Sequence, residues 1–132
     1  MPKLPWKTVN AVDAQTECTV MGSRLPLQHF RSVPGFLLLT MRIRKQLAST
    51  EGLVGYALDA QLTKKTFWTV SAWIDAGHLD GFARTDPHHA GTEAIHPKML
   101  PSTFVFWTAN ADELPIDWSD VRRRVEEAAA GR

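Results

Sequence analysis

The chain has 132 residues, of which 44% are hydrophobic and 22% are charged, and its formal net charge at pH 7 is +1. This length indicates one domain, and this hydrophobic content excludes an intrinsically disordered chain. Because positive and negative charges nearly balance, no global electrostatic field favours nucleic acid or an anionic membrane as a partner.

Targeting and redox signals are sparse. Cys18 is the only cysteine, so a disulfide within the chain is impossible, and this fits a reducing, cytoplasmic location. The N-terminal residues contain two prolines and no apolar core of a signal peptide. No apolar run approaches the roughly 20 residues that span a bilayer. We therefore expect neither a signal peptide nor a membrane span.

Residues 1–16 show no regular period, and we expect them to form an irregular N-terminal arm. The first strand is predicted at residues 17–28. There Cys18, Val20 and Gly22 alternate with their neighbours, as a strand with two different faces requires.

A helix is predicted over residues 33–49. Ser32 is the expected N-cap, Pro34 lies in the first turn, and Gly52 follows just beyond the end. The residues expected to face inward recur at helical spacing: Phe36, Leu39 or Thr40, Ile43 and Leu47.

Two dense apolar runs at 53–62 and 66–74 predict a pair of strands joined by the polar turn 63–65. Trp68 and Trp73 are an odd number of residues apart, so they point to opposite faces of the sheet. Both faces therefore need cover. We expect one face to pack against helices and the other to meet a second subunit or enclose an apolar ligand.

Cap signals mark the next helices. Asp75 precedes a short predicted helix at 76–84. A carboxylate followed by proline at Asp86 and Pro87 then predicts a second helix, which runs to about His96.

A last strand is predicted at 102–109, followed by a C-terminal helix at 118–129 that Asp117 caps. Within that helix, Arg122 is expected to face Glu126 at i,i+4 spacing. The apolar stripe of this helix comprises Trp118, Val121 and Val125.

The order of these elements predicts an α+β fold of the ferredoxin-like βαββαβ type. It comprises a four-stranded antiparallel sheet and an extra C-terminal helix in a single domain at 17–132. We expect two such sheets to pack face to face in a homodimer, because the free face of each carries large apolar groups.

Several common site motifs are absent. The sequence contains no phosphate-binding glycine loop, no HExxH, no cysteine pair and no GxSxG. The aromatic residues lack the basic, glycine-rich strand motif of RNA-binding ferredoxin-like domains, so no nucleic-acid partner is expected. The basic stretches at 42–45 and 122–124 are typical of solvated helix faces.

His88 and His89 are the strongest local candidates for chemistry. They fall in the first turn of a predicted helix, where the helix dipole disfavours the imidazolium ion. A neutral imidazole suits a haem or metal ligand, a general base or a donor to a substrate oxygen. The alternative is a polar helix end at the surface. Adjacent histidines cannot both point into one pocket, and the sequence does not choose between them.

Other candidates lie on the predicted strands. Trp68 and Trp73 suit either core packing or a flat apolar pocket, and the lone tyrosine, Tyr56, suits either a structural hydrogen bond or a substrate contact. Arg24 and Asp59 interrupt apolar strands, so an ion pair is expected, with anion recognition by Arg24 as the alternative.

Together these segments resemble the dimeric α+β-barrel superfamily that includes the antibiotic-biosynthesis-monooxygenase-like proteins. They also resemble a bacterial branch grouped with spheroidene-monooxygenase-like proteins. The resemblance covers about residues 17–110 and rests on VMGSRLPL (20–27), IRKQLASTEGLVGYAL (43–58), KTFWTVSAWID (65–75), DGFARTDPHH (80–89) and FVFWT (104–108).

The superfamily hosts several activities. Cofactor-free members oxidise polycyclic phenols, other members bind and degrade haem between sheet and helices, and spheroidene-monooxygenase-type enzymes carry out haem-dependent oxidation of carotenoids. The chain departs from the haem degraders in the first strand, where Met21 and Ser23 stand in place of asparagine.

The resemblance implies a monooxygenase-like enzyme acting on a hydrophobic aromatic or polyene molecule, or on haem. Its cofactor would be haem or none. Trp73 corresponds to the tryptophan of the haem degraders, His88 would ligate or polarise, and Arg24 would hold an anionic edge. The remaining ligand-binding candidates are His89, Trp68 and Tyr56. The alternatives are a non-catalytic haem- or small-molecule-binding dimer and a structural or interaction module.

Overall fold

The computed structural model of the protein describes the backbone of residues 3–85 and 88–131. Side chains are described within these ranges except at Lys3, His88, His89 and Thr92. Asp86 and Pro87, the predicted second helix cap, lie outside the described residues. No helix in the described part of the chain combines the length and hydropathy needed to cross a bilayer.

A five-stranded sheet forms the centre of the molecule, in the order β1-β3-β4-β2-β5, and its neighbouring strands are antiparallel. The strands are β1 (Lys3–Thr8), β2 (Glu17–Pro26), β3 (Leu53–Gln61), β4 (Thr66–Trp73) and β5 (Thr103–Asn110). The helices are α1 (Val33–Leu47), α2 (Ala76–Ala83), α3 (His88–Ile95) and α4 (Trp118–Ala130).

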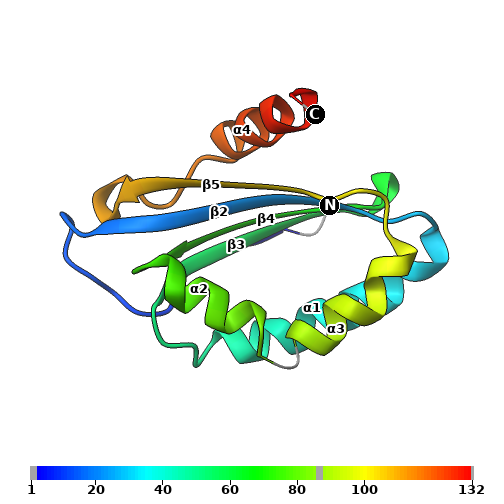
Figure 1. Ribbon diagram of the computed structural model, residues 1–132, viewed down its shortest axis with the longest axis horizontal. Coiled ribbons are helices and arrows are strands. Elements are labelled where there is room, and N and C mark those ends of the chain that lie inside the picture. Colours follow the sequence, from blue (N-terminus) through cyan, green and yellow to red (C-terminus); the bar gives the residue numbers. More distant parts are fainter. Residues whose placement is uncertain (1–2, 86–87, 132) are drawn as a thin grey trace.

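The helices divide between the two faces of this sheet. Figure 1 shows α1, α2 and α3 on one face, here called the helix-facing side, and α4 alone on the other, here called the α4 side. Without β1 and α4, the element order and the strand order β5-β2-β4-β3 are those of a ferredoxin-like βαββαβ unit. The predicted fold class is confirmed, with a fifth strand added.

The prediction of an irregular arm is wrong for Lys3–Thr8, which forms β1 and pairs with β3. A close contact fastens this strand, because the indole of Trp6 packs on the backbone of Gly55. A Cβ built at Gly55 would lie 2.5 Å from Cζ2 of Trp6. The side-chain amide of Asn10 donates to the carbonyl oxygens of Thr50 (3.0 Å) and Leu53 (2.9 Å) just beyond the strand.

Replacing Gly55 with alanine should therefore loosen β1. The new methyl group must displace Trp6, and we expect the free energy of unfolding to fall by about 1–3 kcal/mol. Gly35 in α1 is a matched control, because a Cβ there meets nothing within 4 Å and alanine is the better helix former. Urea unfolding of both variants would test this. Equal stability changes in the two variants would contradict the packing of Trp6 on Gly55.

Two of the predicted helix caps are confirmed. The Asp75 carboxylate accepts a hydrogen bond from the His78 backbone N–H at 2.8 Å, and Asp117 accepts from the Ser119 N–H at 3.1 Å. Ser32 makes no side-chain cap bond, so its predicted role is wrong. A short 3-10 turn over Phe30–Ser32 leads into α1 and leaves Ser32 with helical torsions (φ −86°, ψ −12°) rather than extended ones.

The two tryptophans of β4 lie on opposite faces, as predicted. Trp73 packs with α2 residues on the helix-facing side, whereas Trp68 belongs to the cluster beneath α4. Val121 and Val125 of α4 are fully buried in that cluster. The expectation of a face-to-face dimer assumed a bare sheet face, but α4 occupies this face in Figure 1.

Arg122 fixes α4 to the sheet. Its guanidinium forms an ion pair with Asp59 of β3, a carboxylate that is 1% exposed. The prediction that Asp59 forms an ion pair is therefore confirmed, but its partner is Arg122 rather than Arg24. The expected pairing of Arg122 with Glu126 is replaced because α4 turns Arg122 toward the buried carboxylate. Arg24 instead lies 5.8 Å from the ring centroid of Trp68.

Asp120 links two arginines along α4. Its carboxylate pairs with Arg123 and, at 3.2 Å, with Nε of Arg124. Burial raises the pKa of Asp120, but the hydrogen bonds from these arginines outweigh it and hold the pKa below its usual value. Because the pKa of Asp120 is lower in the folded state than in the unfolded state, its ionised carboxylate stabilises the fold at pH values above the unfolded-state pKa of about 3.9. This stabilisation is lost as the pH falls through the folded-state pKa.

The variant Asp120→Asn should therefore be less stable than the wild type at pH 7 by roughly 0.5 kcal/mol, the usual scale for exposed pairs. Because the asparagine does not titrate, this difference should vanish below about pH 3. Urea unfolding from pH 2.5 to 7 measures both values, and a difference that grows on acidification would contradict the assignment.

Candidate functional site

The central part of the helix-facing side consists of two rows of residues, which the strand register places side by side. Each row takes one residue from β3, β4, β2 and β5, in that order. The first row is Tyr56, Ser71, Met21 and Phe106. The second row is Leu58, Thr69, Ser23 and Phe104. These eight residues are called the two rows below.

Hydroxyl groups concentrate on β4 and β2 within the rows. The hydroxyls of Ser23 and Thr69 are hydrogen-bonded to each other. The Ser71 hydroxyl accepts a hydrogen bond of 2.9 Å from Nε1 of Trp73. These contacts fix the hydroxyls on a face that otherwise packs against apolar helix residues.

Tyr56 is the exception among these polar groups. Its side chain is 6% exposed, and its hydroxyl has no hydrogen-bond partner among the described residues. A buried hydroxyl without a partner costs roughly 1–3 kcal/mol, so native proteins seldom leave one unsatisfied. The arrangement therefore leaves one buried donor on this face available for a polar group that the described residues do not supply.

Apolar clusters border the two rows at both ends. At one end, Trp73 packs with Phe82 of α2, with ring centroids 5.4 Å apart. At the other end, Phe67 packs with Phe36 of α1, with centroids 4.3 Å apart. A polar strip between aromatic clusters suits a flat apolar molecule that carries an oxygen function.

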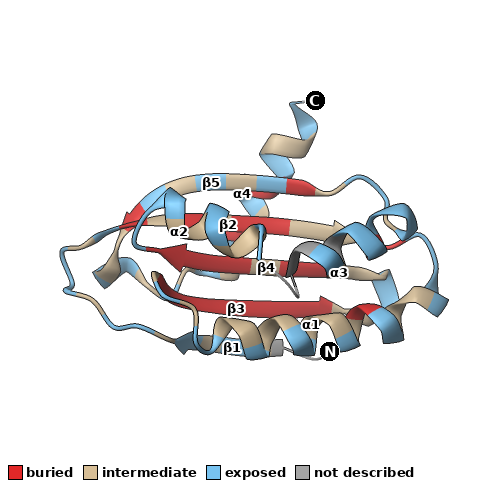
Figure 2. Ribbon diagram, turned by 60° about the horizontal axis from the view of Figure 1, so that its bottom comes forward, coloured by how far each residue is buried: buried red, intermediate tan, exposed pale blue. Residues whose placement is uncertain are grey.

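The rows become accessible toward β5. Phe104 and Phe106 are 52% and 62% exposed, although they lie on the helix-facing side of the sheet. Figure 2 shows the same gradient, with β3 and β4 largely buried and the middle of β5 not. Thr69 and Met21 are half-buried despite their places on central strands. The rows are therefore exposed at β5 in the single chain.

The structure brings together only some of the predicted site residues. Tyr56 and Trp73 share one cluster on the helix-facing side. Trp68 and Arg24 lie on the α4 side, where Nε1 of Trp68 donates to Oε1 of Gln61 at 2.9 Å. One pocket therefore cannot contain all four residues.

His88 and His89 begin α3, which Figure 1 places on the helix-facing side. Their side chains lie outside the described residues, so their predicted role as ligands stays a prediction.

Sequence reasoning missed the hydroxyl groups beside Tyr56. Ser71 and Thr69 have the same parity as Trp73 within β4, and Ser23 has the matching parity within β2. A count of polar residues on the Trp73 face would have found them, because three hydroxyls on one buried face is an unusual pattern for packing alone.

The two rows offer two iron donors, the thioether of Met21 and the phenol of Tyr56, but no imidazole and no thiolate. The described part of the chain also contains no group of three His, Cys, Asp or Glu residues that could hold a metal ion. An imidazole ligand would have to come from His88 or His89.

Two surface hollows lie elsewhere. One, of about 580 Å³, lies between the end of α1 and the start of α2, beside Asp75 and His78. Nδ1 of His78 lies 2.8 Å from the Asp75 carboxylate, and its ring packs on Gly52, whose φ of +80° suits glycine. Hydrogen bonds from the His78 backbone N–H and ring lower the pKa of Asp75.

The second hollow, of about 410 Å³, adjoins His29 and Lys98. Neither contains a residue of the two rows.

No family model and no curated protein matches this chain. Solved structures do match its fold. A conserved protein from Methanosarcina mazei is 14% identical with a TM-score of 0.63, over 71% of this chain and 94% of that one. A cofactor-independent oxygenase from Streptomyces nogalater is 16% identical with a TM-score of 0.57, over 71% and 93%.

An antibiotic biosynthesis monooxygenase is 15% identical with a TM-score of 0.63, over 69% of this chain and 97% of that one. The chain also matches a protein from Fusobacterium nucleatum at 8% identity and a TM-score of 0.65, but it covers 50% of that longer chain. The structural neighbours are thus antibiotic-biosynthesis-monooxygenase-like proteins, and the predicted resemblance is confirmed at the level of the fold.

Proposed function

We propose that this protein is a monooxygenase-like enzyme that binds a flat, hydrophobic molecule bearing an oxygen function over the two rows. The buried, unpartnered hydroxyl of Tyr56 is the observation that carries the proposal. An aromatic or polyene substrate with a phenol, enol or carbonyl group would supply its missing partner. The shared fold with a cofactor-independent oxygenase and an antibiotic biosynthesis monooxygenase supports this reading.

Each part of the site has a role in the proposal. The Tyr56 hydroxyl donates to the substrate oxygen and stabilises the anion that forms when the substrate loses a proton, as a fixed donor in a dry site does. Trp73 and Phe82 would pack against the aromatic part of the substrate at one end of the two rows. Phe104 and Phe106 end the two rows at β5, where they are exposed in the single chain.

The reaction has dioxygen as its co-reactant. In the proposed step, the substrate anion transfers electrons to dioxygen and a methylene beside the aromatic system becomes a carbonyl. One oxygen atom enters the substrate, and the other leaves as water with the two methylene hydrogens. No external reductant is needed, so neither flavin nor haem is required for balance.

We also propose a homodimer, but with a different interface from the face-to-face packing expected from the sequence. Because α4 covers the sheet face expected to pair, we place the homodimer contact at β5, an edge strand with two exposed phenylalanines. Sedimentation at micromolar concentration should show a dimer, and Phe104→Ser/Phe106→Ser should sediment as a monomer. A wild-type protein that sediments as a monomer would contradict the proposed homodimer but not the proposed ligand site.

The state of the lone thiol supports a proposal for the compartment. Cys18 is free and buried, and burial raises the pKa of its thiol, so it is a packing residue rather than a nucleophile. A chain without disulfides fits a reducing compartment, and we place the protein in the cytoplasm.

Oxygen uptake with anthrone as the probe tests the activity. We expect uptake in a one-to-one ratio with anthraquinone formation, above the rate without protein, and at least tenfold slower in Tyr56→Phe. Binding of anthrone without uptake would identify a non-catalytic binding protein instead.

A hemin titration followed by absorbance tests the haem alternative. A saturable Soret band that His88→Ala or His89→Ala abolishes would identify haem and its ligand. Because the proposed step needs no haem, we expect no such band.

A further inference from the structure

The positive charges of the chain are distributed unevenly. Residues 18–50 contain no aspartate or glutamate, whereas the whole chain balances 15 Lys and Arg against 14 Asp and Glu. Within this segment, α1 contributes Arg42, Arg44 and Lys45. A chain with a net charge of +1 therefore carries a locally cationic helix.

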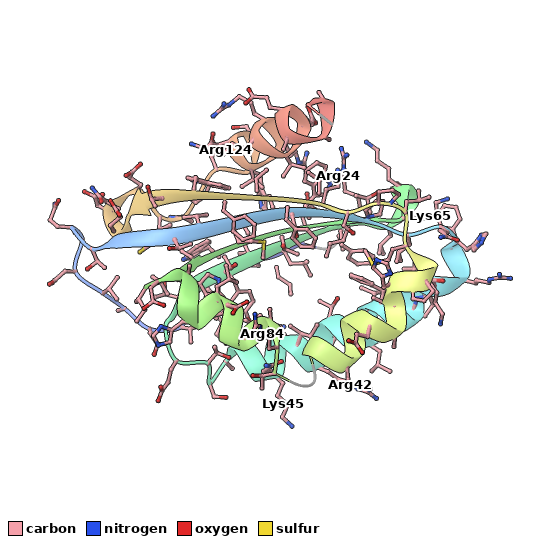
Figure 3. The ribbon with its side chains drawn as sticks, viewed as in Figure 1. Arg24, Arg42, Lys45, Lys65, Arg84 and Arg124 are labelled. Carbon is pink, nitrogen blue, oxygen red and sulfur yellow. The ribbon has the colours of Figure 1, made fainter. Side chains whose placement is uncertain are left out.

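The outer face of α1 combines these charges with apolar side chains. Leu38 and Met41 are 55% and 54% exposed. With Lys45 they fall at i, i+3 and i+7 spacing, on the side of the helix opposite to the buried Phe36. Figure 3 shows Arg42 and Lys45 on the side of α1 that faces away from the sheet. Leu38, Met41, Arg42 and Lys45 are called the α1 outer face below.

The cations of α1 differ from those of α4. Arg122, Arg123 and Arg124 of α4 each pair with a carboxylate of the chain. Arg42 and Lys45 are exposed and form no ion pair with any described residue. Their charge is thus available to an external partner, whereas the basic run of α4 is neutralised within the molecule.

We propose that the α1 outer face docks on an anionic lipid surface. Cationic side chains beside exposed leucine and methionine suit a bilayer interface, where the charges contact headgroups and the apolar groups enter the acyl boundary. A nucleic acid would match the charge but leave Leu38 and Met41 in water. A second copy docking through the same face would bring like charges together. This attachment needs no membrane-spanning helix, and it does not depend on the proposed oxygenase activity.

Co-sedimentation with lipid vesicles tests the proposal. The probes are vesicles of phosphatidylcholine alone and of phosphatidylcholine with 30% phosphatidylserine, at 50 and 500 mM NaCl. We expect binding to the anionic vesicles at low salt, at least tenfold weaker binding to the neutral vesicles, and loss of most binding at high salt.

Two variants and a control locate the surface. Arg42→Gln/Lys45→Gln should weaken binding about 25-fold, since each cation near an anionic surface contributes about a fivefold factor. Leu38→Ser/Met41→Ser should weaken it several-fold with an unchanged salt dependence. The control Lys7→Gln/Lys64→Gln removes the same charge from β1 and the turn after β3, and should change binding less than twofold. Circular dichroism confirms that each variant is folded.

Three results would overturn the proposal. The first is no binding to anionic vesicles at 50 mM salt. The second is an equal loss in the control and in the α1 variants, which would indicate attraction by overall charge. The third is a change of sedimentation coefficient in Leu38→Ser/Met41→Ser without a change in vesicle binding, which would make a second copy the occupant of this face.

Discussion

Tyr56→Phe should give a protein that is at least as stable as the wild type and markedly poorer at binding or oxidising its ligand. The substitution removes a buried hydroxyl that has no partner within the described chain and keeps the ring that packs beside Trp73. Relief of an unpaired buried group is worth roughly 1 kcal/mol or more in the unfolding free energy. Loss of one fixed donor to a substrate anion costs about 10²–10³ in rate where such a donor is fully used.

Ser71→Ala is the matched control for this prediction. The serine lies beside Tyr56 in the same row, but its hydroxyl accepts the Trp73 Nε1–H at 2.9 Å. Its removal leaves a buried donor unpaired, so we expect a loss of about 1–3 kcal/mol in stability. Urea unfolding and anthrone oxidation measure both variants. A Tyr56→Phe protein that loses stability as Ser71→Ala does would show that the Tyr56 hydroxyl has a structural partner.

Arg122→Met should cause the largest loss of stability, about 3–5 kcal/mol. The substitution leaves the Asp59 carboxylate buried without its cation, which costs far more than the loss of an exposed pair. Because Arg122 also joins α4 to the sheet, the cluster beneath α4 should loosen and Trp68 should become accessible to an aqueous fluorescence quencher.

Two further variants separate the buried ion pair from a general effect of removing charge. Arg123→Met removes an exposed arginine one position along the helix and should cost less than 1 kcal/mol. The double variant Asp59→Asn/Arg122→Met should recover much of the loss, since no uncompensated charge is left in the core. Similar stabilities for Arg122→Met and Arg123→Met would contradict the anchoring role of the ion pair.

Local chemistry predicted much of this fold. The odd spacing of Trp68 and Trp73 assigned the two faces of β4, and the carboxylates of Asp75 and Asp117 marked helix starts. These features depend on neighbours within a few residues. Strand alternation and helix capping are local properties, so a single sequence is sufficient to find them.

Long-range choices could not be predicted in the same way. An apolar stripe showed that α4 must pack, but not that it would lie on the sheet face reserved for a partner. Asp59 clearly required a cation, but its partner is 63 residues away along the chain. β1 was missed because its six residues include Pro5 and only two alternating apolar side chains, Leu4 and Trp6.

The residues of the candidate site were likewise predictable by type but not by their long-range arrangement. Tyr56 and Trp73 were named from the sequence, and both lie on the helix-facing side. Trp68 and Arg24 were named for the same pocket but lie on the α4 side. Residue type alone suggests aromatic and charged candidates. Which of these candidates can contact the same ligand depends on the face of the sheet to which each side chain points, and the register of the paired strands sets that face.

The central claim is that the ligand binds on the Tyr56 face of the sheet. Calorimetric titration with 1,8-dihydroxyanthraquinone, a flat phenol, tests this claim directly in the wild type, Tyr56→Phe and Arg24→Gln. The proposal predicts saturable binding by the wild type, at least tenfold weaker binding by Tyr56→Phe, and unchanged binding by Arg24→Gln. Binding that survives Tyr56→Phe and is lost in Arg24→Gln would place the ligand on the α4 side and contradict the proposal.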